Sequence, residues 1–168
     1  NVLAAKVDNE VWDATRPINQ DARLKLLTWN DKEGKAAMWH SSAHLMAEAV
    51  EQLYPGVQFG IGPDIENGFY YDVDLAEGTI SEKDFKSIES KMIDIARGKH
   101  DFKMRDVSKA EALSYYKGKN DYKVDLIEKL EDGTISFYEH GDFTDLCRGP
   151  HVPHTGFIKA FKLMKVSG

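Results

Sequence analysis

The sequence predicts an α+β protein in which helices pack on an antiparallel sheet. Two long segments carry apolar residues at every third or fourth position, short apolar segments typical of strands lie outside them, and an Asn67-Gly68 turn separates two of these segments. Helices laid on an antiparallel sheet give this fold class. With 168 residues, 42% of them hydrophobic, the chain can bury one core. We therefore expect one main domain with a short appendage.

The appendage is predicted at the N-terminal end. Short β segments are expected at Ala4–Val7, Glu10–Trp12 and Ala22–Leu27, with a turn at Asp8-Asn9. These segments are too short to form a core of their own. A polar break begins at Asn30, which places the boundary between residues 1–30 and residues 31–168.

The main domain is predicted to open with a long helix from Lys35 that ends at Pro55-Gly56. Asn67-Gly68 between apolar segments predicts a hairpin whose strands are Phe59–Ile61 and Phe69–Val73. The remaining expected elements are a helix from Ser81 to Gly98, a shorter helix from Ser108 to Gly118, a segment of helical spacing at Tyr122–Leu130, and strands at Ile135–Tyr138 and Phe157–Leu163.

Charge and composition exclude several functional classes. The net charge of −6 argues against a protein that holds nucleic acid through its overall field, so any RNA contact should be local. Lys159, Lys162 and Lys165 are one local candidate, although such lysines more often form a solvated face. No apolar window approaches the roughly 18 residues of a membrane span, and no secretory signal is visible. We expect a soluble, cytoplasmic protein that has no contact with a membrane.

Two histidines on the predicted long helix form the first candidate site. His40 and His44 are four residues apart, so a helix places them on one face, about 6 Å apart. This spacing suits metal binding or acid–base chemistry, and it also arises by chance beside an apolar stripe. Ser41 stands where the His-Glu-x-x-His metalloproteases carry glutamate, which excludes their chemistry.

Cys147 and His151 form the second candidate pair. Gly149-Pro150 between them forbids a regular helix and bends this segment. Cys147 is the single cysteine of the chain, which rules out an internal disulfide and leaves a buried thiol, a nucleophile or a metal ligand. Together with His40 and His44, the pair completes a tetrahedral zinc set, or three ligands and an open position for water.

Four segments resemble, in order, the signatures of the editing domain of bacterial-type threonyl-tRNA synthetases. They are His40–Leu45 (HSSAHL), Gly62–Asp72 (GPDIENGFYYD), Tyr122–Val124 (YKV) and Asp145–His151 (DLCRGPH). The two His and Cys pairs also occur in alanyl-tRNA synthetases and in free-standing editing proteins, whereas the Gly62–Asp72 segment points to the threonyl enzyme. The resemblance runs from about Lys35 to Gly168, and residues 1–30 resemble the end of the β-grasp domain that precedes editing in this family.

The resemblance implies hydrolysis of the ester that joins serine to threonine tRNA. It assigns the catalytic cluster to His40, His44, Cys147 and His151, with Lys123 positioning water or stabilising charge. Asp145 would hold the ammonium or hydroxyl group of the substrate, and Tyr71 would line the seryl pocket. Covalent catalysis by Cys147 is the weaker alternative, because its thiolate would need a nearby histidine to form.

The resemblance also implies cofactors and partners. Editing is expected to require no metal, although zinc bound by His40, His44, Cys147 and His151 is an open alternative. The parent enzyme would attach threonine to tRNA(Thr) with ATP and Mg²⁺, would carry a catalytic zinc outside this segment, and would be a homodimer, whereas the segment alone is compatible with a monomer. Two other functions stay open at this point: a free-standing alanyl- or seryl-tRNA deacylase, and a non-catalytic zinc-binding module.

Overall fold

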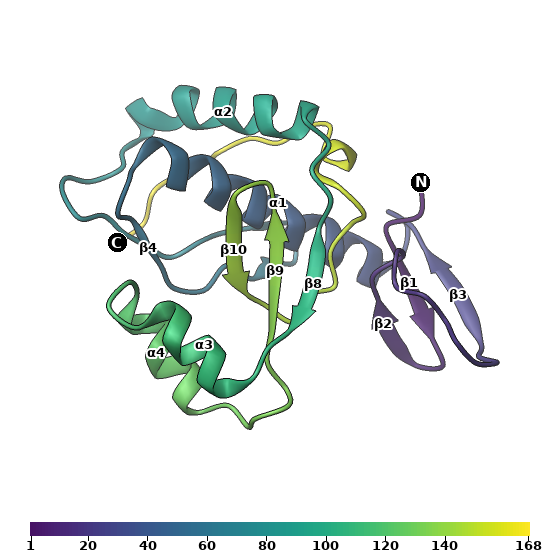
Figure 1. The fold of residues 1–168 in the computed structure, drawn as a ribbon. Helices are drawn as coiled ribbons and strands as arrows, with labels where there is room; N and C mark the ends of the chain where they lie inside the picture. Colours follow the sequence, from purple (N-terminus) through teal and green to yellow (C-terminus); the bar gives the residue numbers. More distant parts are fainter.

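The computed structural model describes residues 1–168 and confirms the α+β class. Its N-terminal part is a small antiparallel sheet in the order β2-β1-β3. These strands are β1 (Ala4–Val7), β2 (Glu10–Trp12) and β3 (Leu24–Leu27). The three predicted strands are thus confirmed, with the third two residues shorter at its start. In Figure 1 this sheet stands beside the larger part of the molecule and is joined to it by the long helix α1.

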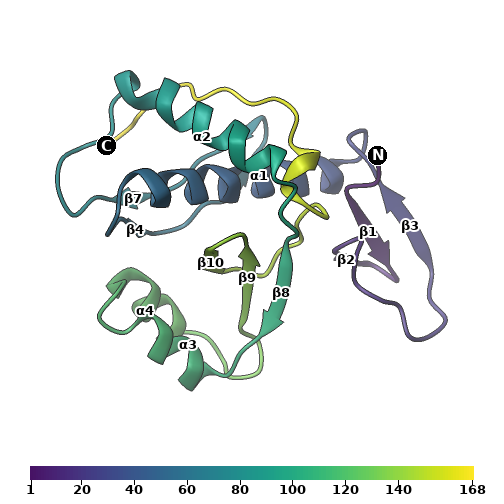
Figure 2. The same ribbon diagram turned by 45° about the horizontal axis from the view of Figure 1, so that its top comes forward.

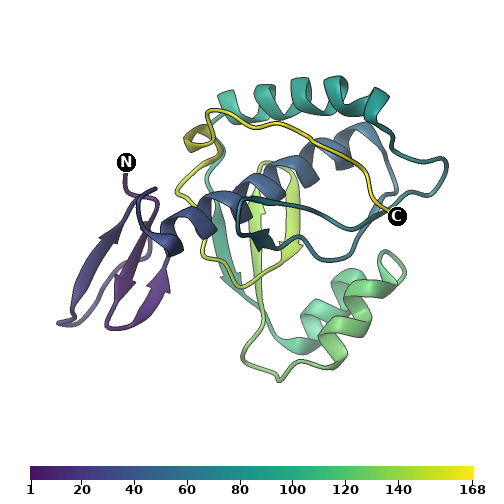
Figure 3. The same cartoon turned by 180° about the vertical axis from the view of Figure 1, so that it is seen from behind.

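Helix α1 (Lys32–Leu53) is the longest element and carries the central part of the core. It begins three residues before the predicted start, directly after Asp31, whose carboxylate accepts a hydrogen bond from the Thr28 N–H. Gly34 is needed there because a Cβ would lie 2.0 Å from the Thr28 carbonyl oxygen. The views in Figures 1 and 3 show α1 between α2 (Phe85–Arg97) and a three-stranded sheet.

That sheet has the antiparallel order β10-β9-β8. Its strands are β8 (Lys103–Asp106), β9 (Ser136–His140) and β10 (Phe143–Leu146). The sequence predicted only the middle strand. All four residues of β8 are exposed, so this strand has no alternation of apolar and polar residues that a pattern could detect. Helices α3 (Lys109–Tyr116) and α4 (Asp121–Glu128) pack together beyond the sheet, and the second confirms the helical spacing after Tyr122.

The predicted hairpin is present in a shorter form. Strands β5 (Asp64–Ile65) and β6 (Gly68–Phe69) pair around the turn, and β4 (Gln58–Phe59) pairs separately with β7 (Val73–Asp74) (Figure 2). The expected continuous strand Phe69–Val73 is therefore wrong, because Tyr71 leaves the ladder and its hydroxyl donates a hydrogen bond to Asp145.

The strand predicted at Phe157–Leu163 is also wrong. Thr155–Phe157 forms one turn of 3₁₀ helix, and the residues after it have no strand partner. Ile158 and Leu163 enter the core between α1 and α2, and the Leu163 N–H donates a 2.8 Å hydrogen bond to Glu89. Phe161, two residues before Leu163, also packs against this core, and these two residues give the segment the alternation of a strand. None of the helices is long and apolar enough to cross a membrane.

Candidate functional site

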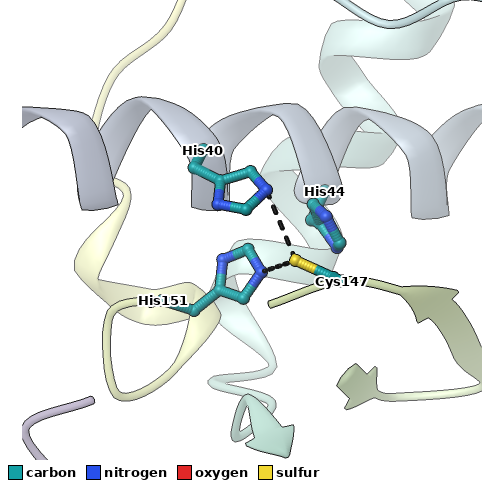
Figure 4. Close-up of side chains that lie close together, drawn as sticks. All are labelled: His40, His44, Cys147 and His151. Carbon is teal, nitrogen blue, oxygen red and sulfur yellow. Dashed lines mark hydrogen bonds between the residues drawn. The ribbon is translucent and has the colours of Figure 1, made fainter. Parts of the chain in front are cut away.

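Helix α1 and the segment after β10 bring the two predicted pairs together (Figure 4). The sulfur of Cys147 lies 3.4 Å from His40 Nε2 and 3.3 Å from His151 Nε2. The ring of His44 lies 5.0 Å from that of His40 and 4.4 Å from that of His151, measured between centroids. One donor atom from each of the four side chains lies within 4.8 Å of the others. The convergence expected from the sequence is confirmed.

The bend between Cys147 and His151 depends on Gly149. This glycine has φ +70°, a left-handed conformation that glycine adopts without strain. A Cβ at this position would lie 2.1 Å from the hydroxyl oxygen of Tyr138. The Gly149 N–H donates a 3.2 Å hydrogen bond to the Cys147 sulfur, which holds the thiol in place.

Burial controls the charge of the cluster. His44 and His151 are 2% and 0% exposed, and removal from water lowers the pKa of both rings well below the usual range. Burial also lowers the pKa of His40. Desolvation raises the pKa of the Cys147 thiol. At neutral pH the site therefore contains three neutral imidazoles around a protonated thiol.

Asp145 and Lys123 form a buried ion pair beside the cluster. Lys123 Nζ lies 2.9 Å from Asp145 Oδ1, and both side chains are 4% exposed. The other carboxylate oxygen, Oδ2, accepts a hydrogen bond from Tyr71 and lies 3.8 Å from His44 Nε2. Burial, followed by the negative charge of Asp145, raises the pKa of Tyr71 well above its usual value. All seven residues named from the sequence thus lie in one region.

Helix α4 places Lys123 through Asn120. The Asn120 side chain caps the helix by accepting a 3.1 Å hydrogen bond from the Lys123 N–H, and its amide donates a 2.9 Å hydrogen bond to the Phe59 carbonyl. Capping side chains of this kind stabilise the first turn of a helix. The start of α4 is therefore tied to β4, and Lys123 faces Asp145.

Sequence reasoning missed Asp13, which reaches the site from the N-terminal part. Its carboxylate accepts hydrogen bonds of 2.7 Å from the His151 N–H and 2.7 Å from the Tyr138 hydroxyl. Burial raises the pKa of Asp13 despite these bonds. Asp13 follows a short, half-buried strand and belongs to no chemical motif, so no local pattern indicates its role.

Two donor distances in the four-donor cluster match those of a tetrahedral zinc site. In tetrahedral zinc sites the metal lies roughly 2.3 Å from sulfur and roughly 2.0–2.1 Å from nitrogen, which separates the donors by about 3.5 Å. The two sulfur–nitrogen distances of 3.4 and 3.3 Å agree with such a site. Zinc held by all four donors would have no open position, which is typical of structural sites.

Comparison with known proteins identifies the family. Residues 135–168 match the family described as the threonyl and alanyl tRNA synthetase second additional domain. The whole chain aligns with threonine–tRNA ligases, at 59% identity with that of Cytophaga hutchinsonii and 60% with that of Porphyromonas gingivalis. A third relative, from Parabacteroides distasonis, is 58% identical over 99% of the chain.

The chain spans about a quarter of these relatives, 26% of the length of each. The alignment extends over the N-terminal sheet as well as the four-donor cluster, since it covers all or nearly all of the chain. The profile match covers β9, β10 and the Cys147–His151 bend. The chain therefore belongs to the threonyl-tRNA synthetase family and corresponds to the portion that carries the editing domain.

Proposed function

We propose that this chain performs post-transfer editing, which is hydrolysis of the ester that joins serine to tRNA(Thr). The observation that carries the proposal is the meeting of three imidazoles with the buried Lys123–Asp145 pair. Ester hydrolysis needs an oriented water, a group that takes its proton, and a positive charge for the developing oxyanion. The cluster offers side chains for each of these tasks.

A synthetic site for threonine needs such a second reaction. Serine lacks one methyl group of threonine, and a missing methyl or methylene discriminates by only about 1–3 kcal/mol. A pocket built for threonine therefore also charges serine. An editing pocket that excludes the extra methyl group would hydrolyse the seryl ester and leave the threonyl ester intact.

Asp145 and Tyr71 are proposed to bind the seryl group. The Asp145 side chain is 4% exposed, so a substrate ammonium beside it would be held with little screening by water. The Tyr71 hydroxyl donates a hydrogen bond to the same carboxylate. The substrate would either displace this hydroxyl or bind the carboxylate together with it. The carboxylate of Asp145 thus sets where the ester carbonyl lies relative to the imidazoles.

His40, His44 and His151 are proposed to position the water and take its proton. Their lowered pKa values keep the rings neutral, and a neutral imidazole accepts a proton at its free nitrogen. Lys123 would stabilise the oxyanion or orient the water. Cys147 contributes its position within the cluster, because a thiol with a raised pKa is a poor nucleophile.

Editing is proposed to proceed without an obligatory metal. The four donors lie within 4.8 Å of one another and could hold zinc, and a zinc ion with an open position would lower the pKa of a bound water. Without zinc, the neutral imidazoles would accept the proton of the water and Lys123 would stabilise the oxyanion. Zinc held by all four donors would leave no place for water.

The surrounding enzyme is proposed from the same family. Residues 1–30 would be the end of a β-grasp domain and residues 31–168 the editing domain. The parent enzyme would attach threonine to tRNA(Thr) with ATP and Mg²⁺, with a catalytic zinc elsewhere, as a cytoplasmic homodimer. The substrate partner of this segment would be mischarged seryl-tRNA(Thr).

Deacylation assays test the proposal. Seryl-tRNA(Thr) and threonyl-tRNA(Thr) are incubated with the full-length enzyme that carries this segment and with its His40→Ala variant. We expect rapid loss of the seryl ester only, and strong slowing by the substitution. Equal hydrolysis of both esters, or no effect of His40→Ala, contradicts the proposal.

Two further measurements separate the alternatives. Faster hydrolysis of alanyl-tRNA(Ala) than of seryl-tRNA(Thr) would favour the free-standing type of deacylase. No hydrolysis of any ester, together with stoichiometric zinc and unfolding by a chelator, would favour a structural zinc module.

A further inference from the structure

We propose that Ser41 is a positioning residue that fixes the tautomer of His151, so that Nδ1 carries the ring proton and Nε2 is the free nitrogen in the cluster. The tautomer follows from hydrogen-bond geometry alone, and only its effect on catalysis rests on the proposed function. Ser41 lies directly after His40 on α1 and is 0% exposed. Its hydroxyl joins α1 directly to the His151 ring and to the Val152 N–H.

The Ser41 hydroxyl oxygen has three close partners. It lies 2.7 Å from the Ala37 carbonyl oxygen and 2.9 Å from His151 Nδ1, and it accepts a 3.0 Å hydrogen bond from the Val152 N–H. A hydroxyl has one hydrogen to donate and two lone pairs to accept with. The three contacts therefore use its full capacity.

The assignment of that one hydrogen decides the tautomer. A carbonyl oxygen only accepts, so the 2.7 Å contact between Ser41 and Ala37 needs the hydroxyl hydrogen. The Val152 N–H occupies one lone pair. The remaining lone pair faces His151 Nδ1 and is satisfied only by a proton on that nitrogen. In the opposite tautomer Nδ1 would compete with the Ala37 carbonyl for this hydrogen, so one of the two contacts would have no hydrogen between its atoms.

Aromatic neighbours pack against the His151 ring and restrict its rotation away from Ser41. Phe102 stacks on one side at 4.8 Å and 14°, and the ring of Tyr138 meets it edge-on at 4.5 Å. With Nδ1 held by Ser41, Nε2 lies 3.3 Å from the Cys147 sulfur. A neutral His151 then presents its lone pair to the cluster, where it serves as a proton acceptor.

Ser42 provides a matched control on the same helix. Its hydroxyl donates to the Met38 carbonyl at 2.8 Å, which is the same contact four residues back, and the residue is 2% exposed. It makes no hydrogen bond to the His151 segment. Ser41→Ala and Ser42→Ala thus remove the same atoms and the same helix contact, and only the first removes the bonds to His151 and Val152.

Nuclear magnetic resonance tests the inference without any activity. Two-bond ¹⁵N–¹H correlation spectra of the histidine-labelled chain, recorded with a chelator at neutral pH, report which ring nitrogen of His151 carries the proton. We expect Nδ1 in the wild type and in Ser42→Ala, and a loss of this preference in Ser41→Ala. A wild-type proton on Nε2 overturns the inference by itself, even if Ser41→Ala does not fold. An unchanged tautomer in a folded Ser41→Ala variant also overturns it.

Deacylation then tests the catalytic meaning. For histidines that bind metals, loss of the residue that holds the second ring nitrogen typically costs about 10–100-fold in metal affinity or activity, and we take the same range here. We expect Ser41→Ala to lower kcat for seryl-tRNA(Thr) by this factor with little change in KM, and Ser42→Ala to retain wild-type kcat. Equal kcat in the two variants contradicts the positioning role. If the wild-type enzyme does not deacylate seryl-tRNA(Thr), the proposed function is contradicted, whereas the tautomer measurement is unaffected.

Discussion

Lys123 and Asp145 form an ion pair at 2.9 Å in which both side chains are 4% exposed. The two residues come from α4 and β10, which are separate in the sequence and meet beside the imidazole cluster. Burial of two charges is costly, and their mutual attraction offsets this cost only while both are present. The pair therefore couples the stability of the fold to the integrity of the site.

Lys123→Met should destabilise the fold as well as abolish editing. Removing one partner of a buried ion pair typically costs about 3–5 kcal/mol, because the other charge stays buried without compensation. Denaturant unfolding measures this loss. Lys25→Met is the control, since it breaks the exposed Lys25–Asp31 pair at 2.8 Å, and it should change stability far less. Similar losses in both variants would show that the buried pair has no special role.

Cys147→Ala and Cys147→Ser should retain most of the deacylation rate. The raised pKa of the buried thiol keeps it protonated at neutral pH, and a protonated thiol is not a nucleophile. Single-turnover deacylation of seryl-tRNA(Thr) measures the effect. Complete loss of activity in the serine and alanine variants, with the fold intact by circular dichroism, would instead support a covalent mechanism.

Asp13→Asn should weaken both the attachment of the N-terminal sheet and the site. The substitution disturbs two hydrogen bonds, to the His151 N–H and to the Tyr138 hydroxyl, and an unsatisfied buried group costs about 1–3 kcal/mol. Asp8→Asn is the control, because Asp8 accepts an exposed hydrogen bond from the Arg23 N–H remote from the cluster. We expect slower deacylation only in Asp13→Asn. Equal rates in the two variants would refute a role for the N-terminal part in the site.

The contribution of His44 and His151 to the stability of the chain should fall as the pH is lowered from 6.5 to 5. The pKa values of His44 and His151 are lowered in the folded state from the usual 6.5. Above pH 6.5 both states are neutral at these rings. Below it the unfolded chain binds protons that the folded chain does not, so the free energy of unfolding decreases by up to ~1.4 kcal/mol per pH unit for each ring.

Unfolding in urea at several pH values, with a chelator present, measures this slope. His44→Gln should make the slope shallower between pH 6.5 and 5, because one of the buried rings is gone. A slope that is unchanged in His44→Gln would contradict the assignment of the lost stability to this histidine.

Removal of metal should leave editing unchanged. The four donors could hold a metal ion, but the proposed reaction uses neutral imidazoles and Lys123. Deacylation of seryl-tRNA(Thr) by the full-length enzyme is measured after dialysis against a chelator, with the zinc content of the isolated 168-residue chain determined in parallel. Loss of activity that added zinc restores would show that the cluster is a catalytic metal site.

Local chemistry made part of this molecule predictable. The four-residue spacing of His40 and His44 places two imidazoles on one helical face, and Gly149-Pro150 bends the chain between Cys147 and His151. Both statements depend on neighbours in the sequence, and the distances to Cys147 agree with them. The pairing of the two sites came from the family resemblance, because spacing within each pair says nothing about the distance between pairs.

Long-range contacts decided the rest. The exposed residues of β8 form a strand only because they pair with β9, and the alternation of Phe157–Leu163 arises from packing on helices instead of from a sheet. Asp13 and Ser41 act on His151 from 138 and 110 residues away along the chain.

The sequence by itself determined the fold class, the helices and the identity of the reactive side chains, because helix periodicity, turn residues and reactive groups are properties of short segments. Only the tertiary structure decided which carboxylate pairs with Lys123, which hydroxyl contacts His151 and which imidazole rings are buried away from solvent. Those properties depend on burial and on hydrogen bonds between distant segments, and no local pattern encodes them.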